Sequence, residues 1–319
     1  MSDSYLVTGG MGFIGSFVVE ALVAAGHRVT VYDKKPTDNS FSLSMDQAVL
    51  KQVNVLAGDV LDQDQLLAAL KKYDVTGVVH LAAVLTAESS VDPVPAVAVN
   101  CVGLANVLEA ARTLGLSRVV WASSIAVYGF DHYTPETRVP NGAAHNPDDI
   151  YGACKSFGEH LTDIYWRDFG VHSIGLRFVH GTGVGRQRGG GVWARELIDK
   201  PALGQQSALP HADELENWLS VEDQASAVVA ATRCDSYIEA PTVTIAGFDI
   251  QPRRAAAAMV SSWLPDAQIA LEPGRLGRPV NYDISAAHQL LDWAPTADMA
   301  VTLRSMINRV RRKGGLPEV

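Results

Sequence analysis

The 319-residue sequence predicts an α/β protein with a doubly wound parallel sheet and a smaller C-terminal lobe. Three observations predict this class. Short apolar runs alternate with longer segments of helical periodicity. These runs are apolar throughout, as expected of parallel strands that are covered on both faces. Hydrophobic residues make up 47% of the chain against 19% charged residues, which provides a large core and excludes a disordered chain.

The elements follow in a regular order up to residue 178. Gly26 ends the first helix, because glycine readily adopts the left-handed conformation of a helix cap. Beyond 178 the rhythm breaks in the glycine-rich segment 181–191. We expect strands at residues 5–8, 28–33, 53–57, 77–81, 118–123, 173–178 and 242–246. We expect helices at residues 13–25, 63–72, 95–114, 151–169, 193–199, 221–233, 253–263 and 299–312.

The charge balance and the N-terminal sequence limit the partners and the compartment. Lys and Arg number 26 against 35 Asp and Glu, so the formal net charge of −9 repels polyanions such as nucleic acids. The basic residues within 309–313 are interpreted as a solvated helix end. An uninterrupted apolar run of about 18 residues would predict a membrane span, and the chain has none. Since a basic and apolar leader is also missing, we expect a cytoplasmic protein without membrane contact.

The three cysteines, Cys101, Cys154 and Cys234, fit no zinc signature, so no metal site is expected. Cys154 lies between two candidate catalytic residues, which makes a reactive thiol conceivable. We interpret it instead as a small buried hydrophobic residue, the commoner environment of free cysteine.

The strongest local signal is the run Thr8-Gly9-Gly10-Met11-Gly12-Phe13-Ile14-Gly15. Its glycines follow a predicted strand and open a predicted helix, which is the context that dinucleotide binding requires. Gly9 permits the tight turn, Gly12 lets the backbone approach a pyrophosphate, and Gly15 lets the helix pack on the strand. The N–H groups at the helix start then face the phosphates.

Acidic residues at two strand ends indicate which nucleotide is bound. Asp33 ends the second strand, where its carboxylate can accept hydrogen bonds from both ribose hydroxyls and repel a 2′-phosphate. This favours NAD over NADP, although Lys34 and Lys35 are cations that could tolerate that phosphate. Asp59 is placed to contact the adenine amino group, with a helix N-cap as the alternative, for which Asp62 competes.

Tyr151 and Lys155 lie four residues apart at the start of a predicted helix, and therefore on one face. A nearby ammonium favours the phenolate, so Lys155 is expected to lower the tyrosine pKa and make Tyr151 a usable proton shuttle. Ser123 and Ser124 end a predicted strand, where open α/β sheets place their chemistry. A serine hydroxyl there can hold the substrate oxygen that gains charge during hydride transfer.

With these motifs in this order, the sequence resembles the extended short-chain dehydrogenase/reductases of the NAD-dependent epimerase/dehydratase family over nearly its whole length. The matching runs are TGGMGFIG, GDV, HLAA, SSIAVYG and YGACK. The resemblance implies a Rossmann fold, a catalytic triad of Ser124, Tyr151 and Lys155, and NAD as cofactor. His80 is interpreted as a core histidine. The implied cofactor contacts are Gly9, Gly12, Phe13, Ile14, Gly15, Asp33, Asp59, Val60, Leu81, Ala82, Ala83, Asn100, Tyr151, Lys155 and Phe178.

The resemblance also divides the chain. Residues 1–178 are expected to form the NAD-binding domain, to which 216–247 return, and residues 179–215 and 248–319 the substrate-binding lobe. The expected substrate contacts are Leu85, Ser124, His180, Arg186 and Arg278.

The substrate half departs from the sugar-nucleotide members of the family. His180 stands where they have asparagine, and Glu216 stands where they have an arginine that binds the nucleotide phosphate. A glutamate facing a pyrophosphate would repel it. The cations that could replace that arginine are Arg186, Arg188, Arg275 and Arg278.

Three functions follow from these observations. The first is a dehydrogenase or reductase acting on a secondary alcohol or ketone of a sugar, sugar acid or polyol, with NAD exchanged at each turnover. The second is an NAD-retaining sugar-nucleotide epimerase, such as a UDP-sugar 4-epimerase. The third is a non-catalytic NAD sensor, disfavoured because such proteins typically lose the Tyr-Lys pair. Dehydration is disfavoured because Ile125 and Ala126 cannot transfer protons.

The resemblance further implies a homodimer that pairs the helices expected at 95–114 and 151–169. Candidate interface residues are Ala96, Leu104, Phe157 and Leu161, for which the alternative is an ordinary core position.

Overall fold

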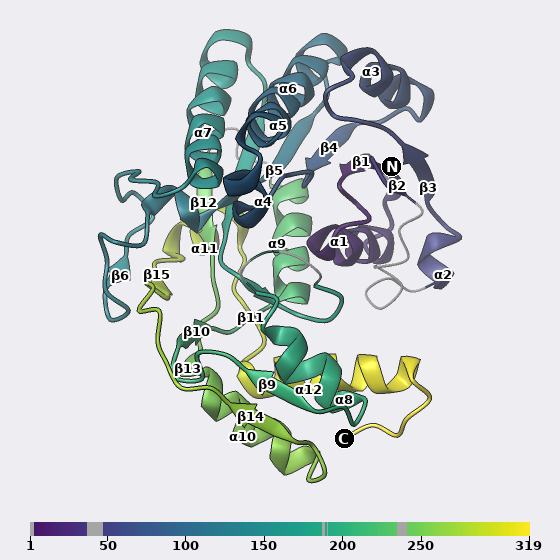
Figure 1. Cartoon of the computed structure of the whole chain (residues 1–319). Coiled ribbons are helices and arrows are strands. Elements are labelled where there is room, and N and C mark those ends of the chain that lie inside the picture. Colours follow the sequence, from purple (N-terminus) through teal and green to yellow (C-terminus); the bar gives the residue numbers. More distant parts are fainter. Residues whose placement is uncertain (1–2, 37–46, 187–188, 190, 235–240) are drawn as a thin grey trace.

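The protein is built around a parallel sheet of seven strands with helices on both faces (Figure 1). The computed structural model describes residues 3–36, 47–186, 189, 191–234 and 241–319. The sheet has the strand order β12-β7-β5-β4-β1-β2-β3, and every neighbouring pair is parallel, which confirms the predicted fold class. Its strands are β1 (Ser4–Thr8), β2 (Arg28–Asp33), β3 (Asn54–Ala57), β4 (Gly77–His80), β5 (Arg118–Ser124), β7 (Ser173–Phe178) and β12 (Thr242–Ile245).

Two helical layers cover the sheet. One contains α3 (Gln63–Lys72), α6 (Gly103–Leu114) and α7 (Ile150–Phe169), and the other contains α1 (Phe13–Ala24), α9 (Val221–Arg233) and α11 (Ser285–Leu291). Side chains alternate between the layers along each strand. Leu6 joins the hydrophobic cluster beneath α3 and α6, whereas Val7 joins the cluster beneath α1 and α9. The apolar strands are therefore buried on both faces, as their sequences require.

The helix expected at 95–114 is present, begins two residues earlier and contains a π-helical turn. The run consists of α5 (Pro93–Val97), the π-helical turn η2 (Ala98–Val102) and α6. By length and composition the run from Pro93 to Leu114 could cross a membrane, but 44% of its most apolar window is buried inside the protein, as in a core helix. Ala96 and Leu104 are buried and face the interior, so these two candidate interface residues belong to the core.

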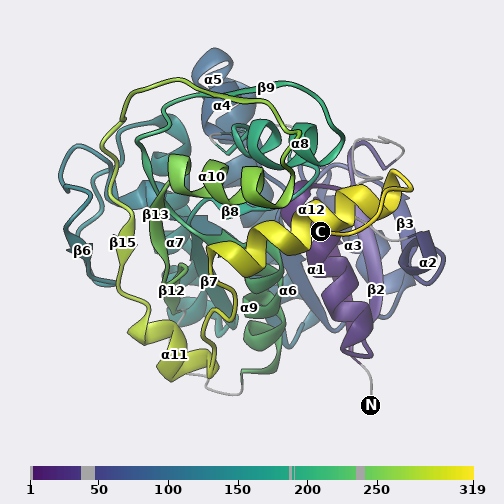
Figure 2. The same ribbon diagram turned by 90° about the horizontal axis from the view of Figure 1, so that it is seen from below.

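The C-terminal lobe lies beneath the sheet layer in Figure 1, and Figure 2 shows α10 and α12 crossing it. Its short strands pair across long stretches of chain: β8 with β11, β9 with β14, and β10 with β13. Its elements are β8 (Gly181–Thr182), η4 (Arg195–Asp199), α8 (Lys200–Ala202), β9 (Ser207–Leu209), β10 (Leu215–Asn217), β11 (Leu219–Ser220), β13 (Ile250–Pro252), α10 (Arg253–Trp263), β14 (Ile269–Leu271) and α12 (Met299–Lys313). The remaining elements are α2 (Gln47–Leu50), α4 (Thr86–Val91), η3 (Ile125–Tyr128), β6 (Arg138–Val139) and its partner β15 (Asn281–Tyr282).

Candidate active site and cofactor cleft

The glycine loop between β1 and α1 leaves no room for side chains. Gly9 has a φ of +67°, and a Cβ atom on it would lie 2.8 Å from the amide nitrogen of Ala82. A Cβ on Gly15 would collide with the Gly9 carbonyl oxygen, and one on Gly12 would lie 2.9 Å from the same oxygen. The loop lies beside the boundary between β1 and β4, where the strand order reverses and open α/β sheets bind their ligands. This cradle fits a dinucleotide, whose pyrophosphate the N–H groups of Phe13 and Ile14 would meet.

Asp33 is fixed at the end of β2. Its Oδ2 accepts a hydrogen bond from the Met11 amide at 3.1 Å, and its Oδ1 accepts one from the Lys35 amide at 3.1 Å. The Lys34 ammonium lies 2.8 Å from Asp59 Oδ2, so its charge is already paired. This pairing leaves Lys34 less able to attract a 2′-phosphate.

Asp59 is not the N-cap of α3. That cap is Asp62, which accepts a hydrogen bond from the Gln65 amide at 2.9 Å. Asp59 accepts instead from the Leu61 amide and from Lys34. Burial works to raise the pKa of Asp59, but the hydrogen bonds from Lys34 and from the Leu61 amide, together with the Lys34 charge, outweigh it and hold that pKa below its usual value.

The segment after β4 lies along the loop through main-chain contacts. The Leu81 amide donates to the Thr8 carbonyl at 3.1 Å, and the Ala82 amide donates to the Thr8 hydroxyl. His80 is a core histidine, as expected: its Nδ1 lies 2.8 Å from the same hydroxyl. Burial and then the Lys155 charge lower the pKa of His80 to about 3, so the ring stays neutral. Ala83 continues this segment and is half-buried.

Asn100 holds the main chain that follows β4, beside the cofactor cleft. Its Oδ1 accepts from the Val84 amide and its Nδ2 donates to the Val84 carbonyl, both at 2.9 Å. These hydrogen bonds fix the Val84 main chain, and the expected contact of Asn100 with the cofactor stays a prediction. Val60 and Phe178 are buried among core side chains, and their expected contacts with the cofactor stay predictions. Leu85 precedes α4 and is half-buried beside Gly189.

The structure brings Ser124, Tyr151 and Lys155 together at the end of β5 and the start of α7. The Ser124 hydroxyl interacts with the Tyr151 phenol, and the Lys155 ammonium lies 5.4 Å from the centre of the Tyr151 ring. Lys155 Nζ donates to the Ala122 carbonyl at 2.7 Å. Asp149 caps α7 by accepting from the Gly152 amide, which fixes where the helix begins. The arrangement can serve proton transfer at a carbinol oxygen.

The pKa of Tyr151 departs from the sequence expectation. Burial raises the pKa of Tyr151 to about 12, against lowering effects from the Ser124 hydroxyl and the Arg186 charge. The expectation that Lys155 lowers it is therefore wrong for the protein alone. Burial lowers the pKa of Lys155 to about 8, against raising effects that include Cys154 and Glu159.

Ser123 has a different role from Ser124, the serine to which the resemblance assigned the catalytic role. Its hydroxyl donates to Glu159 Oε1 at 2.5 Å. Glu159 also receives a bidentate hydrogen bond from Arg177 at 2.8 and 2.5 Å, and His145 Nε2 lies 3.2 Å from it. Burial opposes ionisation, but the hydrogen bonds from Arg177 and His145 bring the pKa of Glu159 down to about 2. The sequence signal that could have revealed Glu159 was its spacing, because it lies four residues beyond Lys155 on the same helix.

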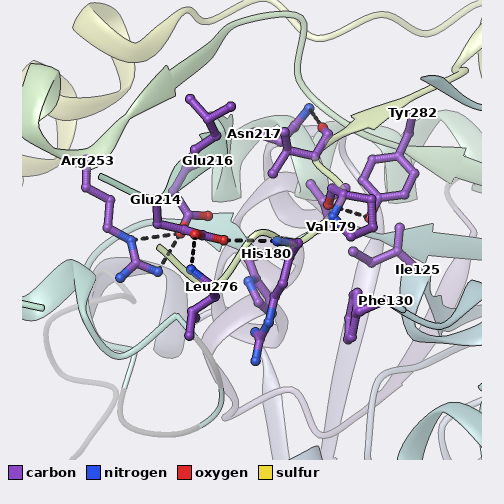
Figure 3. A pocket seen from close by; sticks show the side chains of 14 residues that line it. Ile125, Phe130, Val179, His180, Glu214, Glu216, Asn217, Arg253, Leu276 and Tyr282 are labelled. Atoms are coloured by element: carbon purple, nitrogen blue, oxygen red, sulfur yellow. Dashed lines mark hydrogen bonds and ion pairs between the residues drawn. The ribbon is translucent and has the colours of Figure 1, made fainter. Parts of the chain in front are cut away.

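Beyond the triad lies a small cavity of about 30 Å³, lined by apolar and charged side chains, between η3, β10 and the segment 276–282 (Figure 3). This is room for one or two water molecules. The Arg253 guanidinium binds Glu216 at 2.6 and 2.9 Å, and both side chains are buried. Glu214 accepts hydrogen bonds from the main-chain amides of 276–278, at 2.5, 3.0 and 3.4 Å. The sequence missed Glu214 and Arg253, whose partners lie about 40 to 60 residues away.

Two of the five expected substrate residues line this cavity. His180 lines it, and burial together with the charges of Arg186, Arg278 and Arg253 lowers its pKa to about 3, so the imidazole is neutral. Arg278 lines the cavity as well and lies 5.2 Å from the Phe130 ring. Arg275 is half-exposed and 3.7 Å from Glu136. Arg188 lies outside the described residues.

The cysteines lie in surroundings that do not favour a reactive thiol. Cys154 and Cys234 are buried, and all three thiols are free. Burial, followed by interaction with Cys154, raises the pKa of the Cys101 thiol to about 12. In the described ranges, no group of three His, Cys, Asp or Glu side chains could hold a metal ion.

The structure is similar to solved structures of two kinds. A consensus L-threonine 3-dehydrogenase is 26% identical with a TM-score of 0.82, over 95% of this chain and 98% of that one. The UDP-glucose 4-epimerase of Thermus thermophilus, solved with NAD, is 25% identical with a TM-score of 0.79, over 97% and 99%.

Sequence relatives point the same way. A putative UDP-glucose 4-epimerase of Methanocaldococcus jannaschii is 30% identical over 71% of this chain and 72% of its own length. The human UDP-glucose 4-epimerase is 33% identical over 57% of this chain, a match that spans only 55% of the human protein. The family model for the NAD dependent epimerase/dehydratase family matches residues 5–246. The predicted family is thereby confirmed: the chain belongs to the NAD dependent epimerase/dehydratase family, an extended short-chain dehydrogenase/reductase.

Proposed function

We propose that the protein is an NAD-dependent oxidoreductase that oxidises a secondary alcohol, or reduces the ketone, of a sugar-like substrate. The observation that carries the proposal is the meeting of Ser124, Tyr151 and Lys155 beside a glycine cradle without room for side chains. NAD, when bound, supplies the hydride acceptor.

Each member of the triad has a distinct task in the proposal. The Tyr151 phenol exchanges a proton with the substrate hydroxyl, and the Ser124 hydroxyl donates to the same oxygen as negative charge develops on it. Lys155 holds the nicotinamide ribose and supplies positive charge beside the phenol. Glu159, through Ser123 and Arg177, positions the strand end that carries Ser124.

The cavity favours net dehydrogenation over the epimerase alternative. Glu216 and Arg253 neutralise each other at the place where a phosphate-binding arginine was expected, so this part of the lining lacks that anchor for a nucleotide phosphate. Epimerisation of a sugar nucleotide is the second candidate, because several sequence relatives are named UDP-glucose 4-epimerases.

The test is an absorbance assay of the reduced nicotinamide with a panel of carbinols. Accumulation of reduced cofactor supports the dehydrogenase, whereas conversion of UDP-glucose to its 4-epimer without net reduction supports the second candidate. Tyr151→Phe should lower kcat by about 10²- to 10⁴-fold with NADH affinity nearly unchanged. Tyr165→Phe, on the same helix, is the matched control and should retain activity. Full turnover in Tyr151→Phe would refute the proposed mechanism.

We further propose the domain division and the homodimer. The division assigns 1–178 and 216–247 to the NAD-binding domain and the remainder to the substrate lobe, in keeping with the packing of α9 on α1 and the pairing of β12 with β7. At the start of 216–247, β10 and β11 instead pair with the lobe strands β13 and β8. The homodimer would pair the outer faces of α5, α6 and α7, of which α5 and α7 carry exposed apolar side chains. Small-molecule substrates and a cytoplasmic location complete the proposal.

A further inference from the structure

Arg186, in the segment after β8, is a buried cation without a counter-ion in the described chain. Arg186 is only 8% exposed. One hydrogen bond runs from its Nη2 to the Gly181 carbonyl at 3.2 Å, while its buried Nε donates to no described atom. The guanidinium carbon lies 4.4 Å from the centre of the Phe13 ring. Gly191 allows this fit, because a Cβ there would lie 2.9 Å from Arg186 Cδ.

The charges around Arg186 do not balance. Glu216 is committed to Arg253, and Glu214 to the amides of 276–278. Three guanidinium groups (Arg186, Arg253 and Arg278) therefore face two carboxylates, while His180 is neutral. The site retains one positive charge in excess. Among the described residues neither Arg186 nor Arg278 has a carboxylate within 4 Å, and Arg186 is the more deeply buried of the two. A buried charge of this kind is unfavourable until an anion pairs with it.

Arg186 is also close enough to the chemistry to influence it. Its charge acts on the Tyr151 phenol, and the phenol acts in return on the guanidinium. It acts on His180 of the cavity as well. Arg186 thus interacts electrostatically with both the catalytic phenol and His180 of the cavity, while the amides at the start of α1 remain available for the cofactor pyrophosphate.

We propose that Arg186 binds the carboxylate of a short hydroxy acid, or of the oxo acid formed from it. This inference rests on the proposed function for the reacting carbinol and narrows its substrate class. In oxidation the carbinol C–H bond breaks and its hydride reduces NAD, the O–H proton passes to Tyr151, and the hydroxy acid becomes an oxo acid. A carboxylate fits because its two oxygens can accept from the guanidinium in parallel.

The test measures binding without turnover. Propionate and propionamide have nearly the same shape and differ in charge, so their Kd values for the NAD-saturated protein isolate the anion preference. Wild type should bind propionate about 10- to 100-fold more tightly than propionamide. Arg186→Gln should abolish this ratio and Arg186→Lys should keep part of it. Arg304→Gln, an exposed arginine of α12, is the control and should leave the ratio unchanged.

Equal binding of the two probes by wild type, including no measurable binding of either, would overturn the inference. It would also be overturned if Arg186→Gln raised the Kd for NAD tenfold or more and left the probe ratio intact, since Arg186 would then serve the cofactor. Kinetics separate this result from the proposed function. The kinetic assay compares the turnover of glycerate and 3-hydroxybutyrate with that of their amides. Equal turnover of acids and amides by the wild type refutes the Arg186 role and leaves the dehydrogenase proposal intact. An intact binding ratio of the two probes, with no turnover of any carbinol, refutes the dehydrogenase.

Discussion

Tyr151 and Lys155 lie one helical turn apart, and burial moves their pKa values in opposite directions. The pKa of Tyr151 rises to about 12 and that of Lys155 falls to about 8, because each charged form is poorly solvated. The reactive phenolate therefore depends on added positive charge or hydrogen-bond donors at the site. Ser124 and Arg186 supply part of that help within the chain itself.

The Lys155 pKa predicts a pH-dependent stability. The unfolded chain keeps this proton up to about the ordinary value of 10.5, whereas the folded protein releases it near pH 8. Between these values the unfolded state binds more protons, so stability rises with pH. Relative to Lys155→Met, the cofactor-free wild type should gain about 3 kcal/mol of unfolding free energy from pH 7 to pH 10, measured by urea denaturation. A pH-independent difference would contradict this, and the exposed Lys72→Met serves as control.

Asp33 predicts the choice of cofactor. Asp33→Asn keeps an acceptor for the Met11 amide but removes the charge that repels a 2′-phosphate. We expect the affinity for NADP to rise about tenfold and the affinity for NAD to fall a few-fold, since a neutral amide is the weaker acceptor. Fluorescence titrations with NADH and NADPH measure both. Asp64→Asn, an exposed acid on α3, should change neither, and an unchanged NADPH affinity in Asp33→Asn would count against its role.

At the scale of elements, the π-helical turn η2 gives Asn100 its function. It lies between α5 and α6, where the widened turn carries an asparagine whose two amide atoms hold the Val84 main chain. Such turns interrupt helices frequently at functional sites. The turn thereby ties the helix layer to the segment that borders the cofactor cradle.

Removing the Asn100 amide should be costly. Asn100→Ala leaves a buried donor and a buried acceptor of Val84 without partners, and we expect a loss of about 2–3 kcal/mol in unfolding free energy and weaker NADH binding. The comparison is Asn106→Ala, which removes a single hydrogen bond to the Val60 carbonyl and should cost about 1 kcal/mol. Equal losses in the two variants, by urea denaturation, would show that Asn100 has no special role.

At the scale of the whole molecule, local sequence patterns predict the large sheet. They do not predict the lobe, because its strands pair across long stretches of chain. Each strand of the large sheet is a continuous apolar run that carries its own signal, and the observed bounds lie within one residue of those expected. The lobe strands have two or three residues, too few to show a period, and β9 pairs with β14 some 60 residues later. Their hydrogen bonds follow from the packed chain rather than from local sequence.

The candidate site divides in the same way. Gly9, Tyr151 and Lys155 could be predicted because a turn or a helix fixes their spacing within a few residues. The contact of Glu214 with the amides of 276–278 joins segments more than 60 residues apart, so no spacing reveals it. Burial likewise sets the direction of the Tyr151 pKa, and burial belongs to the folded molecule rather than to a motif.

The assembly of the molecule is the last prediction. Val94 is 79% exposed on α5 and Phe157 is 47% exposed on α7, and these helices lie side by side with α6 (Figure 1). Such contiguous apolar faces commonly mark interfaces. Light scattering should give twice the 34.1 kDa chain mass for wild type and the single-chain mass for Phe157→Asp. Phe248→Asp adds the same charge at a 59% exposed phenylalanine outside these helices and should stay dimeric. A single-chain mass for wild type at micromolar concentration would refute the dimer and would leave this apolar face exposed to solvent.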